Sequence, residues 1–600
     1  MQVYPKDALE AISLNSVSLS EGPWKRRFDL NRNYLLSLEN DAYLEAFHWC
    51  FAPAGIRCPR PKISWGGWMG TTHDGEFHGH YLSACGRTIC LTGDEELSRK
   101  TASLVSSLSH YQHQNGAFWV GAMTEQDLVG LHTGKLKTVP YYTIHKLLMG
   151  LYELGSLGGS DLALEMSFRL ADFVADTINK LNEEEITNLL ACEHGGIAEI
   201  MLEIASSTRK QRHFDAAISL LDRSVIDPLS SAEDILTGRH ANTTIPILQG
   251  AARAYEMTGE ERYRRAVENF HEIVMSTRYS VMGGDCSIGE YWHGPKTTMK
   301  SLCASWQETC GTYNWQRLTE YLFRWSADPK YGDAYERGQI NGILAAQHPE
   351  TGMFVYFMPM KPGPREPNPD NYDPDPPETG SKHFGRPLRC FWCCYGTGIE
   401  AFSNPLSATY YRRGDTIWIN RYIASQMETE LNGVPLKIDV RTDFPYSGIV
   451  TFIIRLKQPA DFTLALRIPW WVGDGVSIRM NLTPFKIEGE TSSIKRSSWL
   501  KIKRSWRICD TVEMILPMHL YTESMREDPR YSAVLYGPHV LAGCISDAPK
   551  LDVPRENPAL RLIQDTFDPF TFLYDDTRPF RFVPLCRIVD EEYNVYFEMG

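Results

Sequence analysis

The sequence lacks three features that would place it in other classes of protein. No stretch of about 18 consecutive apolar residues occurs, so no membrane-spanning helix is expected. The 61 basic residues are fewer than the 74 acidic ones, and the formal net charge of −13 argues against a nucleic-acid binder, which would present a basic face. Residues Met1–Asp7 lack the apolar core of a signal peptide, so we expect a cytoplasmic protein unless a leader has been removed.

Cysteine is too sparse for a disulfide framework. Fourteen cysteines are spread over 600 residues, whereas proteins held by disulfides are small and rich in cysteine. Most of the fourteen stand alone among apolar residues, and we expect these to behave as small buried hydrophobes. Three need another explanation, because Cys393 and Cys394 are adjacent and Cys310 closes the run Glu308-Thr309-Cys310.

Length and composition indicate a globular protein of two or three domains. With 43% hydrophobic and 22% charged residues, the chain is not mostly disordered. Residues 1–30 are typical of an arm, residues 31–415 carry apolar residues at helical spacing, and residues 416–600 contain short β-rich runs between turn residues. We therefore expect a helical domain followed by antiparallel β-sandwich material.

The helical part repeats one kind of junction. Residues 92–97 and 258–263 both place a glycine after one apolar helix and acidic residues in the first turn of the next. Helix–turn–helix units that recur every roughly 45–60 residues predict a helical toroid or solenoid, and closure into a toroid would place a pocket at one mouth. The proline-rich run 361–380 is incompatible with a helix or a central strand, and we expect a loop that leads to Cys393.

Four histidines occur at or near expected helix starts, and each has glycine or small residues close by. They are His80, His145, His194 and His240. Any one of them is more often a structural histidine. Four at similar points of successive helical units favour a shared pocket, in which imidazoles would bind sugar hydroxyls.

The unusual cysteines and a nearby carboxylate form a candidate metal site. We hypothesise that Glu308, Cys310, Cys393 and Cys394 bind one zinc ion, because thiolates and carboxylates are zinc ligands. Four protein ligands complete a tetrahedron, which is usual for a purely structural zinc. The alternative is that one thiolate is also a nucleophile, since metal binding ionises a thiol that is otherwise mostly protonated at neutral pH.

Together these motifs resemble glycoside hydrolase family 127, the β-L-arabinofuranosidases and their relatives. The resemblance covers most of the chain, and Glu-Thr-Cys followed later by Cys-Cys is its most specific part. The runs that carry it are Gly79–Ala84, Tyr142–Lys146, Glu193–Gly196, His240–Thr243, Gly289-Glu290, Glu308–Cys310, Cys393-Cys394 and Leu466–Trp470.

The resemblance implies an (α/α)6 barrel followed by a β-sandwich, and a retaining exo-glycosidase that acts on a β-linked L-arabinofuranoside or a similar pentose. It implies Cys393 as the nucleophile, Glu290 as the general acid/base, and zinc as the cofactor. Its zinc ligands fall on Glu308, Cys310, Cys393 and Cys394, and its sugar-contacting histidines on His145, His194 and His240, with His80 nearby. The expected partner is a carbohydrate, without nucleic acid or membrane. The oligomeric state stays open, with a dimer among the options.

Three alternatives remain. The first is a non-catalytic sugar-binding or scaffold toroid closed by a structural zinc. The second is a glycosidase of the same family with another sugar, because the residues around Glu290 and the additional His78 depart from the family pattern. The third is a toroid enzyme of different chemistry, such as a uronic-acid lyase or an unsaturated-glucuronyl hydrolase, which would leave the cysteines without a role.

Overall fold

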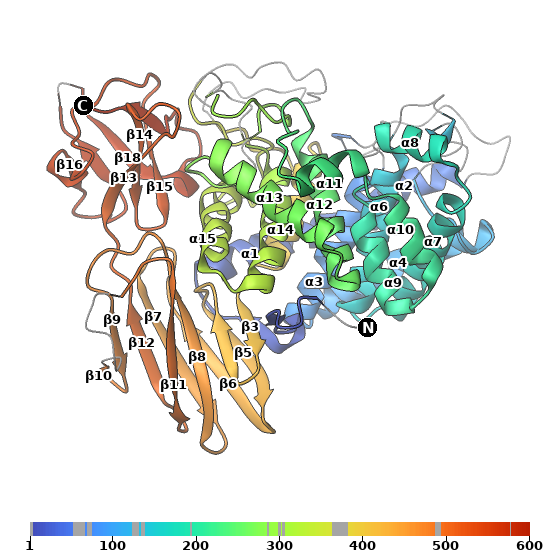
Figure 1. Ribbon diagram of the computed structural model, residues 1–600, viewed down its shortest axis with the longest axis horizontal. Helices are drawn as coiled ribbons and strands as arrows, with labels where there is room; N and C mark the ends of the chain where they lie inside the picture. The colour runs from blue at the N-terminus through green and yellow to red at the C-terminus, as the bar shows by residue number, and fades with distance from the viewer. Residues whose placement is uncertain are drawn as a thin grey trace.

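The structure is a computed structural model in which the chain forms a helical part and, beside it, two β regions (Figure 1). It describes residues 4–51, 66–68, 75–122, 131–133, 139–192, 195–284, 287–297, 302, 307–362, 382–485, 494–576 and 578–600. Within these ranges, no helix combines the length and the apolar composition that crossing a membrane requires.

Six helices form a closed inner ring. They are α3 (Glu76–Thr92), α6 (Pro140–Ser156), α9 (Ala198–Thr208), α12 (Ala241–Thr258), α14 (Thr309–Ser326) and α17 (Cys393–Ser403). Each packs against the next, and α17 packs back on α3, which closes the ring. A helix surrounded by other helices must be apolar or small on all sides, and every residue of α17 is buried.

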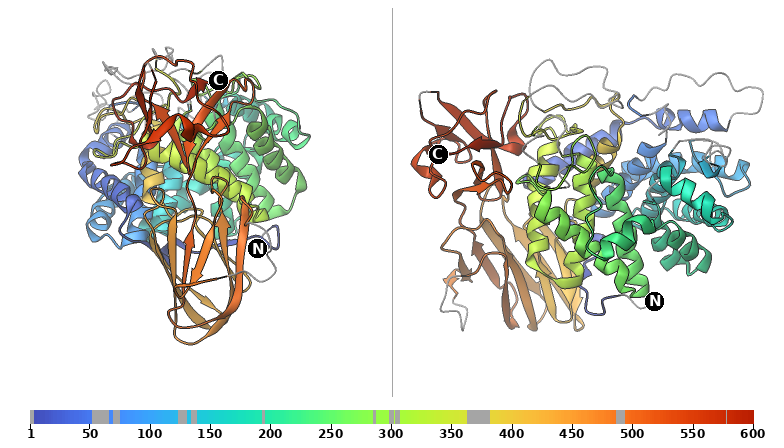
Figure 2. Two further views of the ribbon diagram at one scale, coloured as in Figure 1. Left: turned by 90° about the vertical axis from the view of Figure 1, so that its left-hand side faces the viewer. Right: turned by 45° about the horizontal axis from the view of Figure 1, so that its top comes forward.

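A second layer of helices covers the ring. Its members are α1 (Pro23–Ser37), α4 (Glu95–Gln114), α7 (Asp161–Ile178), α10 (Gln211–Ser219), α13 (Glu261–Thr277) and α15 (Pro329–Gly338). Each packs on one ring helix: α1 on α17, α4 on α3, α7 on α6, α10 on α9, α13 on α12 and α15 on α14. These helices are amphipathic, and α13 buries Tyr263, Val267, Phe270 and Val274 at helical spacing. The double layer confirms the predicted (α/α)6 barrel, and Figure 2 shows the helical part from two further sides.

The described part of the helical region also contains four helices outside the two layers. They are α2 (Asn40–Cys50), α8 (Glu183–Cys192), α11 (Arg223–Ser230) and α16 (Leu344–Ala346).

Glycines bring α3 and α6 into close contact. A Cβ added to Gly79 would lie 1.9 Å from the Lys146 carbonyl carbon, and one on Gly150 would lie 2.2 Å from the Gly79 oxygen. A larger residue at either position would therefore push the two helices apart.

The barrel is followed by a sandwich of two sheets, with strand orders β1-β3-β4-β8-β11 and β10-β9-β12-β7-β6-β5-β2. All pairs are antiparallel except β4 with β8, which is parallel. The strands are β1 (Glu10–Ala11), β2 (Val17–Leu19), β3 (Tyr410–Arg413), β4 (Thr416–Ile419), β5 (Ser425–Leu431), β6 (Val434–Arg441), β7 (Ile449–Leu456), β8 (Ala460–Ile468), β9 (Ser477–Met480), β10 (Thr483–Pro484), β11 (Ser498–Trp506) and β12 (Thr511–Ile515). The predicted arm thus supplies an edge strand to each sheet. The predicted limits at residues 30 and 415 stay predictions.

The C-terminal part forms a third sheet. Its strands are β13 (Leu520–Ser524), β14 (Tyr531–Tyr536), β15 (His539–Gly543), β16 (Leu562–Gln564), β17 (Phe572–Tyr574), β18 (Phe580–Pro584) and β19 (Tyr596–Glu598). Residues just before β19 hold a segment of the helical part in place. The Val595 amide donates to the Met360 carbonyl at 2.9 Å, and the Tyr593 hydroxyl donates to the Pro359 carbonyl at 2.6 Å.

Candidate active site

The six ring helices contribute residues at or near their N-termini to one cavity of about 290 Å³. The lining includes Glu76 of α3, Tyr142, His145 and Lys146 of α6, Gly196 before α9, His240 before α12, Glu308 before α14 and Cys393 of α17. Helix N-termini carry partial positive charge and amide N–H groups without intrahelical partners. This end of the barrel is therefore suited to stabilise carboxylates and thiolates.

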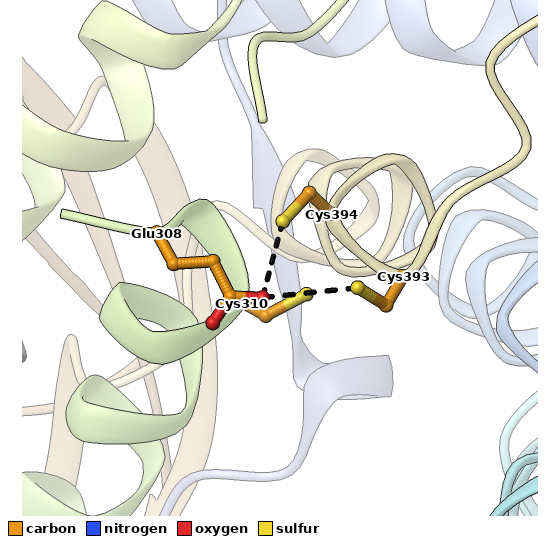
Figure 3. A group of neighbouring side chains, drawn as sticks. All are labelled: Glu308, Cys310, Cys393 and Cys394. Atoms are coloured by element: carbon orange, nitrogen blue, oxygen red, sulfur yellow. Dashed lines mark hydrogen bonds between the residues drawn. The ribbon is translucent and has the colours of Figure 1, made fainter. Parts of the chain in front are cut away.

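Glu308, Cys310, Cys393 and Cys394 meet in one buried group (Figure 3), and two of them, Glu308 and Cys393, line the cavity. Glu308 is the N-cap residue of α14, and Cys393 and Cys394 are the first two residues of α17. The Glu308 Oε1 atom lies 3.4 Å from the Cys394 sulfur and 3.7 Å from the Cys393 sulfur. All four side chains are buried, and their ligand atoms lie within 4.8 Å of one another. The structure thus brings the four predicted ligands together.

The three thiols differ in their proton affinity. Hydrogen bonds from Cys310 and Cys394 hold the pKa of the Cys393 thiol well below its usual range. Burial raises the pKa of both Cys310 and Cys394. Cys393 is therefore the member of the group that carries negative charge most readily, and the thiolate is the nucleophilic form of cysteine.

The group fits a tetrahedral metal ion. Zinc–sulfur bonds of about 2.3 Å place tetrahedral ligand atoms about 3.8 Å apart, close to the separations within this group. Three sulfurs and one carboxylate oxygen are a donor set that suits zinc. The Thr397 hydroxyl can orient one ligand, because it lies 3.3 Å from the Cys310 sulfur, to which it can donate; the carbonyls of Cys393 and Cys394, both at 3.2 Å, are its other acceptors.

Glu290 lies at the tip of a two-residue hairpin turn in the cavity wall. Ile288 and Tyr291 exchange backbone hydrogen bonds, and the φ angles of Gly289 and Glu290 are 52° and 72°. Positive φ at both positions is the requirement of a type I′ turn. A glutamate is unusual in this conformation, and backbone strain of this kind is concentrated at functional sites.

Two side chains hold the Glu290 carboxylate. His240 accepts a hydrogen bond from the Thr243 amide at Nδ1, so its Nε2–H donates to Glu290 Oε2 at 2.8 Å. The Tyr356 hydroxyl donates to Glu290 Oε1 and also lies 3.5 Å from the Cys393 sulfur. Through Tyr356, the predicted acid/base and the predicted nucleophile face the same part of the cavity.

The predicted histidines have different positions. His145 and His240 line the cavity, and burial lowers the pKa of His145 well below its ordinary value, so its ring is neutral. His194 lies outside the described residues. His80 is buried behind α17, where its Nδ1 atom lies 2.5 Å from Glu400 and its ring packs against Gly396. It packs between α3 and α17 and is not among the residues that line the cavity, and its expected contact with sugar stays a prediction.

Comparison with known families decides the identity. The pattern of the β-L-arabinofuranosidase GH127 catalytic domain matches residues 16–405, and that of the GH127 middle domain matches residues 416–518. The chain belongs to glycoside hydrolase family 127. No curated protein sequence matches it significantly. The protein is a glycoside hydrolase, as its resemblance to family 127 implied.

Solved structures with the family 127 fold cover nearly the whole chain. A β-L-arabinofuranosidase from Geobacillus stearothermophilus T6 is 17% identical with a TM-score of 0.74, over 97% of this chain and 100% of that one. Another GH127 β-arabinofuranosidase is 16% identical with a TM-score of 0.74, over 99% and 98%. A protein described as a glycoside hydrolase is 14% identical with a TM-score of 0.75, over 100% and 99%. At these identities the likeness concerns the fold.

The family 127 cavity also contains residues that sequence reasoning did not single out. Tyr356 lies outside every motif, and the sequence around it carries no signal of its role. Tyr142 lies within the run Tyr142–Lys146, and Glu76 lies four residues before His80, yet the sequence motifs assign neither of them a function. Tyr142 and Tyr356 both pack against the cysteine group. Glu76 is an acidic residue at the start of a helix that is buried along nearly its whole length, itself included.

Proposed function

We propose that this family 127 glycoside hydrolase is a retaining exo-β-L-arabinofuranosidase with Cys393 as nucleophile and Glu290 as general acid/base. The contact of Tyr356 with both residues is the observation that carries this proposal. Because its hydroxyl contacts both, the Glu290 oxygen and the Cys393 sulfur are at most about 6 Å apart, a limit that is compatible with the ~5–5.5 Å of retaining pairs. Inverting enzymes need room for a water molecule and use a wider spacing.

The reaction has two steps. In the first, the Cys393 sulfur attacks the anomeric carbon while the bond from that carbon to the leaving oxygen breaks, and the Glu290 carboxyl protonates this oxygen. In the second, the Glu290 carboxylate takes a proton from water. The water oxygen bonds to the anomeric carbon as the carbon–sulfur bond breaks, and Cys393 leaves as a thiolate. Two displacements retain the anomeric configuration.

Glu308, Cys310, Cys393 and Cys394 are the residues that would hold zinc, which when bound supplies positive charge that keeps the thiols ionised. The Tyr356 hydroxyl can donate to the Cys393 sulfur when this atom is a thiolate, and so orients it. His240 fixes the carboxylate of Glu290 from the other side. The neutral His145 ring, which also lines the cavity, is suited to bind a sugar hydroxyl.

Two observations support the choice of substrate. Two structural relatives are described as a β-L-arabinofuranosidase and a β-arabinofuranosidase. The helix N-termini of the ring surround the cavity, and a pocket of this kind suits the terminal sugar of a chain better than an internal one. The alternative is a family 127 enzyme whose substrate ends in another sugar. The same assay with other aryl glycosides tests it.

Trapping of the covalent intermediate tests the proposal. The substrate is p-nitrophenyl β-L-arabinofuranoside, whose good leaving group needs little help from an acid. Glu290→Gln should therefore form the glycosyl-enzyme but hydrolyse it slowly, and peptide mass spectrometry should find one pentosyl group on Cys393. Cys393→Ser should lower kcat by about four orders of magnitude or more.

Cys192→Ser is the matched control, because Cys192 also lines the cavity but lies outside the metal group. It should retain activity close to that of the wild type. A pentosyl group on a residue other than Cys393, or undiminished turnover by Cys393→Ser, would contradict the mechanism. Bound zinc without turnover of any aryl glycoside would favour a scaffold protein.

A further inference from the structure

Glu76 is a buried carboxyl group in the wall of the cavity. It is the first residue of α3, its side chain is fully buried, and it lines the same space as Cys393. Among the residues that the structure describes, neither of its carboxyl oxygens makes a well-aligned hydrogen bond, and the Tyr142 hydroxyl is close enough to lower the Glu76 pKa by hydrogen bonding. Buried polar atoms in proteins are nearly always hydrogen-bonded, so an exception of this kind needs an explanation.

The explanation does not lie in stability. Removing a carboxyl group from water without giving it a partner destabilises the folded state. Burial raises the pKa of Glu76 well above its ordinary value, the charge on Cys393 raises it further, and Tyr142 and Lys146 lower it in part. Such a residue is expected where function requires a polar group that the fold itself does not need.

The surroundings of Glu76 are polar and are held in place by packing. Gly79, one turn later in α3, lies against the backbone of Lys146, which fixes Glu76 beside the first turns of α6. The Lys146 ammonium lies 5.3 Å from the centre of the Tyr142 ring, and both residues line the cavity. A carboxyl, an ammonium and a phenol hydroxyl therefore share one wall, and together they can accept and donate hydrogen bonds.

We propose that Glu76, supported by Tyr142 and Lys146, binds hydroxyl groups of the reacting sugar and thereby determines which sugar the site accepts. A carboxyl group accepts hydrogen bonds from two hydroxyls of one ring, and the ammonium donates to a third oxygen. A sugar without the matching hydroxyl leaves the buried carboxyl unpaired, which is the strongest form of discrimination that a binding site has. The assignment of this wall to sugar binding rests on the proposed glycosidase function.

Binding of free sugars tests the proposal without relying on hydrolysis. Calorimetry would measure the affinities of L-arabinose, its 2-, 3- and 5-deoxy derivatives and a panel of other pentoses and hexoses for the wild type, Glu76→Gln and Glu76→Leu. Glu76→Leu removes the polar atoms at similar size and should weaken binding of the preferred sugar about a hundredfold, whereas Glu76→Gln keeps one acceptor and should lose about tenfold. Both Glu76 variants should bind L-arabinose with the same affinity as the deoxy derivative that lacks the hydroxyl recognised by Glu76.

Thermal unfolding distinguishes this role from a structural one. Glu95 is the first residue of the neighbouring helix α4 and is exposed, so Glu95→Gln is a matched control for loss of a carboxylate at a helix N-terminus. We expect Glu76→Gln to unfold at the same or a higher temperature than the wild type and to bind as much zinc, whereas Glu95→Gln unfolds at a slightly lower temperature and binds sugar normally.

The proposal would be overturned if no sugar of the panel bound to the wild type, or if Glu76→Leu bound sugars as the wild type does. A lower unfolding temperature for Glu76→Gln with unchanged sugar affinity would also overturn it, because it would assign Glu76 to the fold. Failure of the proposed catalytic mechanism would be seen separately, as sugar binding that depends on Glu76 in a protein that hydrolyses no aryl arabinofuranoside.

Discussion

Glu290 and Cys393 contact the same hydroxyl group, that of Tyr356. The two residues come from distant parts of the sequence, one from a tight hairpin turn and the other from the first turn of α17. A single phenol thus sets the distance between the proposed acid/base and the proposed nucleophile. It can donate to either group but holds only one proton, so it can follow the change of charge from sulfur to carboxylate during the reaction.

Removal of this hydroxyl should affect turnover more than binding. Tyr356→Phe keeps the ring that packs on the cysteine group but leaves Glu290 and Cys393 without a common partner. We expect kcat for p-nitrophenyl β-L-arabinofuranoside to fall about ten- to hundredfold with little change in KM, since the hydroxyl positions reacting groups. The control is Tyr141→Phe, because Tyr141 lines the same cavity and its hydroxyl contacts His132 at 2.8 Å. An equal loss in both variants would argue against the positioning role.

Metal affinity should depend on Thr397. Its hydroxyl can donate to the Cys310 sulfur at 3.3 Å, and groups that hydrogen-bond to metal ligands typically contribute 10–100-fold to affinity. Thr397→Val keeps the shape of the side chain, and we expect it to bind zinc about tenfold more weakly in competition with a chelator. Thr319→Val is the matched control, because Thr319 is buried in α14 and its hydroxyl donates to the Trp315 carbonyl at 2.8 Å, away from the cysteine group. Equal zinc affinities in the two variants would contradict the prediction.

Much of this site could be predicted because its parts are local. Glu308 with Cys310, and Cys393 with Cys394, are near neighbours in sequence, and each pair occupies one helix N-terminus. Recurring helical units predict a toroid or a solenoid, the family resemblance implies the closed ring, and a closed ring brings such termini to one mouth. The barrel and the metal group could therefore be derived from short motifs and their repetition.

Other parts depend on contacts that have no local pattern. The position of Tyr356 rests on an isolated bridge between Glu308 and Phe357 and on the Thr309 amide, which donates to the Tyr356 carbonyl at 3.0 Å. Glu76 and His80 are four residues apart and so share one face of α3. Only the first reaches the cavity, because the second meets α17 at Gly396. The sequence alone shows that the two residues share a face of α3. It does not show at which point along this face α17 packs.

Buried His271 should make the protein sensitive to acid. Its ring stacks on Trp315 at 4.5 Å and contacts Tyr331 edge-on at 4.9 Å, and burial lowers its pKa to about 3. An unfolded histidine has a pKa of about 6.5. Between these values the unfolded chain binds a proton that the folded chain does not. His271 therefore does not reduce the free energy of unfolding above about pH 6.5. Below that pH, and down to its folded pKa, it reduces the free energy of unfolding by about 1.4 kcal/mol for each pH unit.

His271→Phe keeps an aromatic ring in this position and removes the titrating nitrogen. Urea unfolding from pH 7.5 to 4.5 should show a shallower loss of stability for the variant than for the wild type, with the difference in slope near 1.4 kcal/mol per pH unit. His110→Gln, at an exposed position of α4, is the control for a surface imidazole. Parallel curves for the wild type and His271→Phe would show that this residue does not contribute to acid unfolding.

Arg467 joins the sandwich to the barrel, and its replacement should lower the free energy of unfolding of the protein. It is fully buried on β8, forms ion pairs with Asp333 and Glu336 of α15, and donates from Nε to the Asn420 carbonyl at 2.6 Å. The planar fork of arginine can serve three acceptors at fixed angles, whereas a lysine ammonium cannot reach them in the same way. Burial already raises the pKa of Asp333 to about 6, and Arg467 is the cation that limits this rise.

Arg467→Lys should therefore destabilise the protein by about 3–5 kcal/mol, the usual effect of breaking a buried ion pair. The measurement is the free energy of unfolding in urea, with zinc content as the check that the metal group is intact. Arg479→Lys is the matched control, because Arg479 pairs with Glu513 at 3.1 Å on the exposed side of the sandwich, where such pairs contribute about 1 kcal/mol or less. A similar, small loss in both variants would mean that the barrel and the sandwich do not depend on Arg467 for their association.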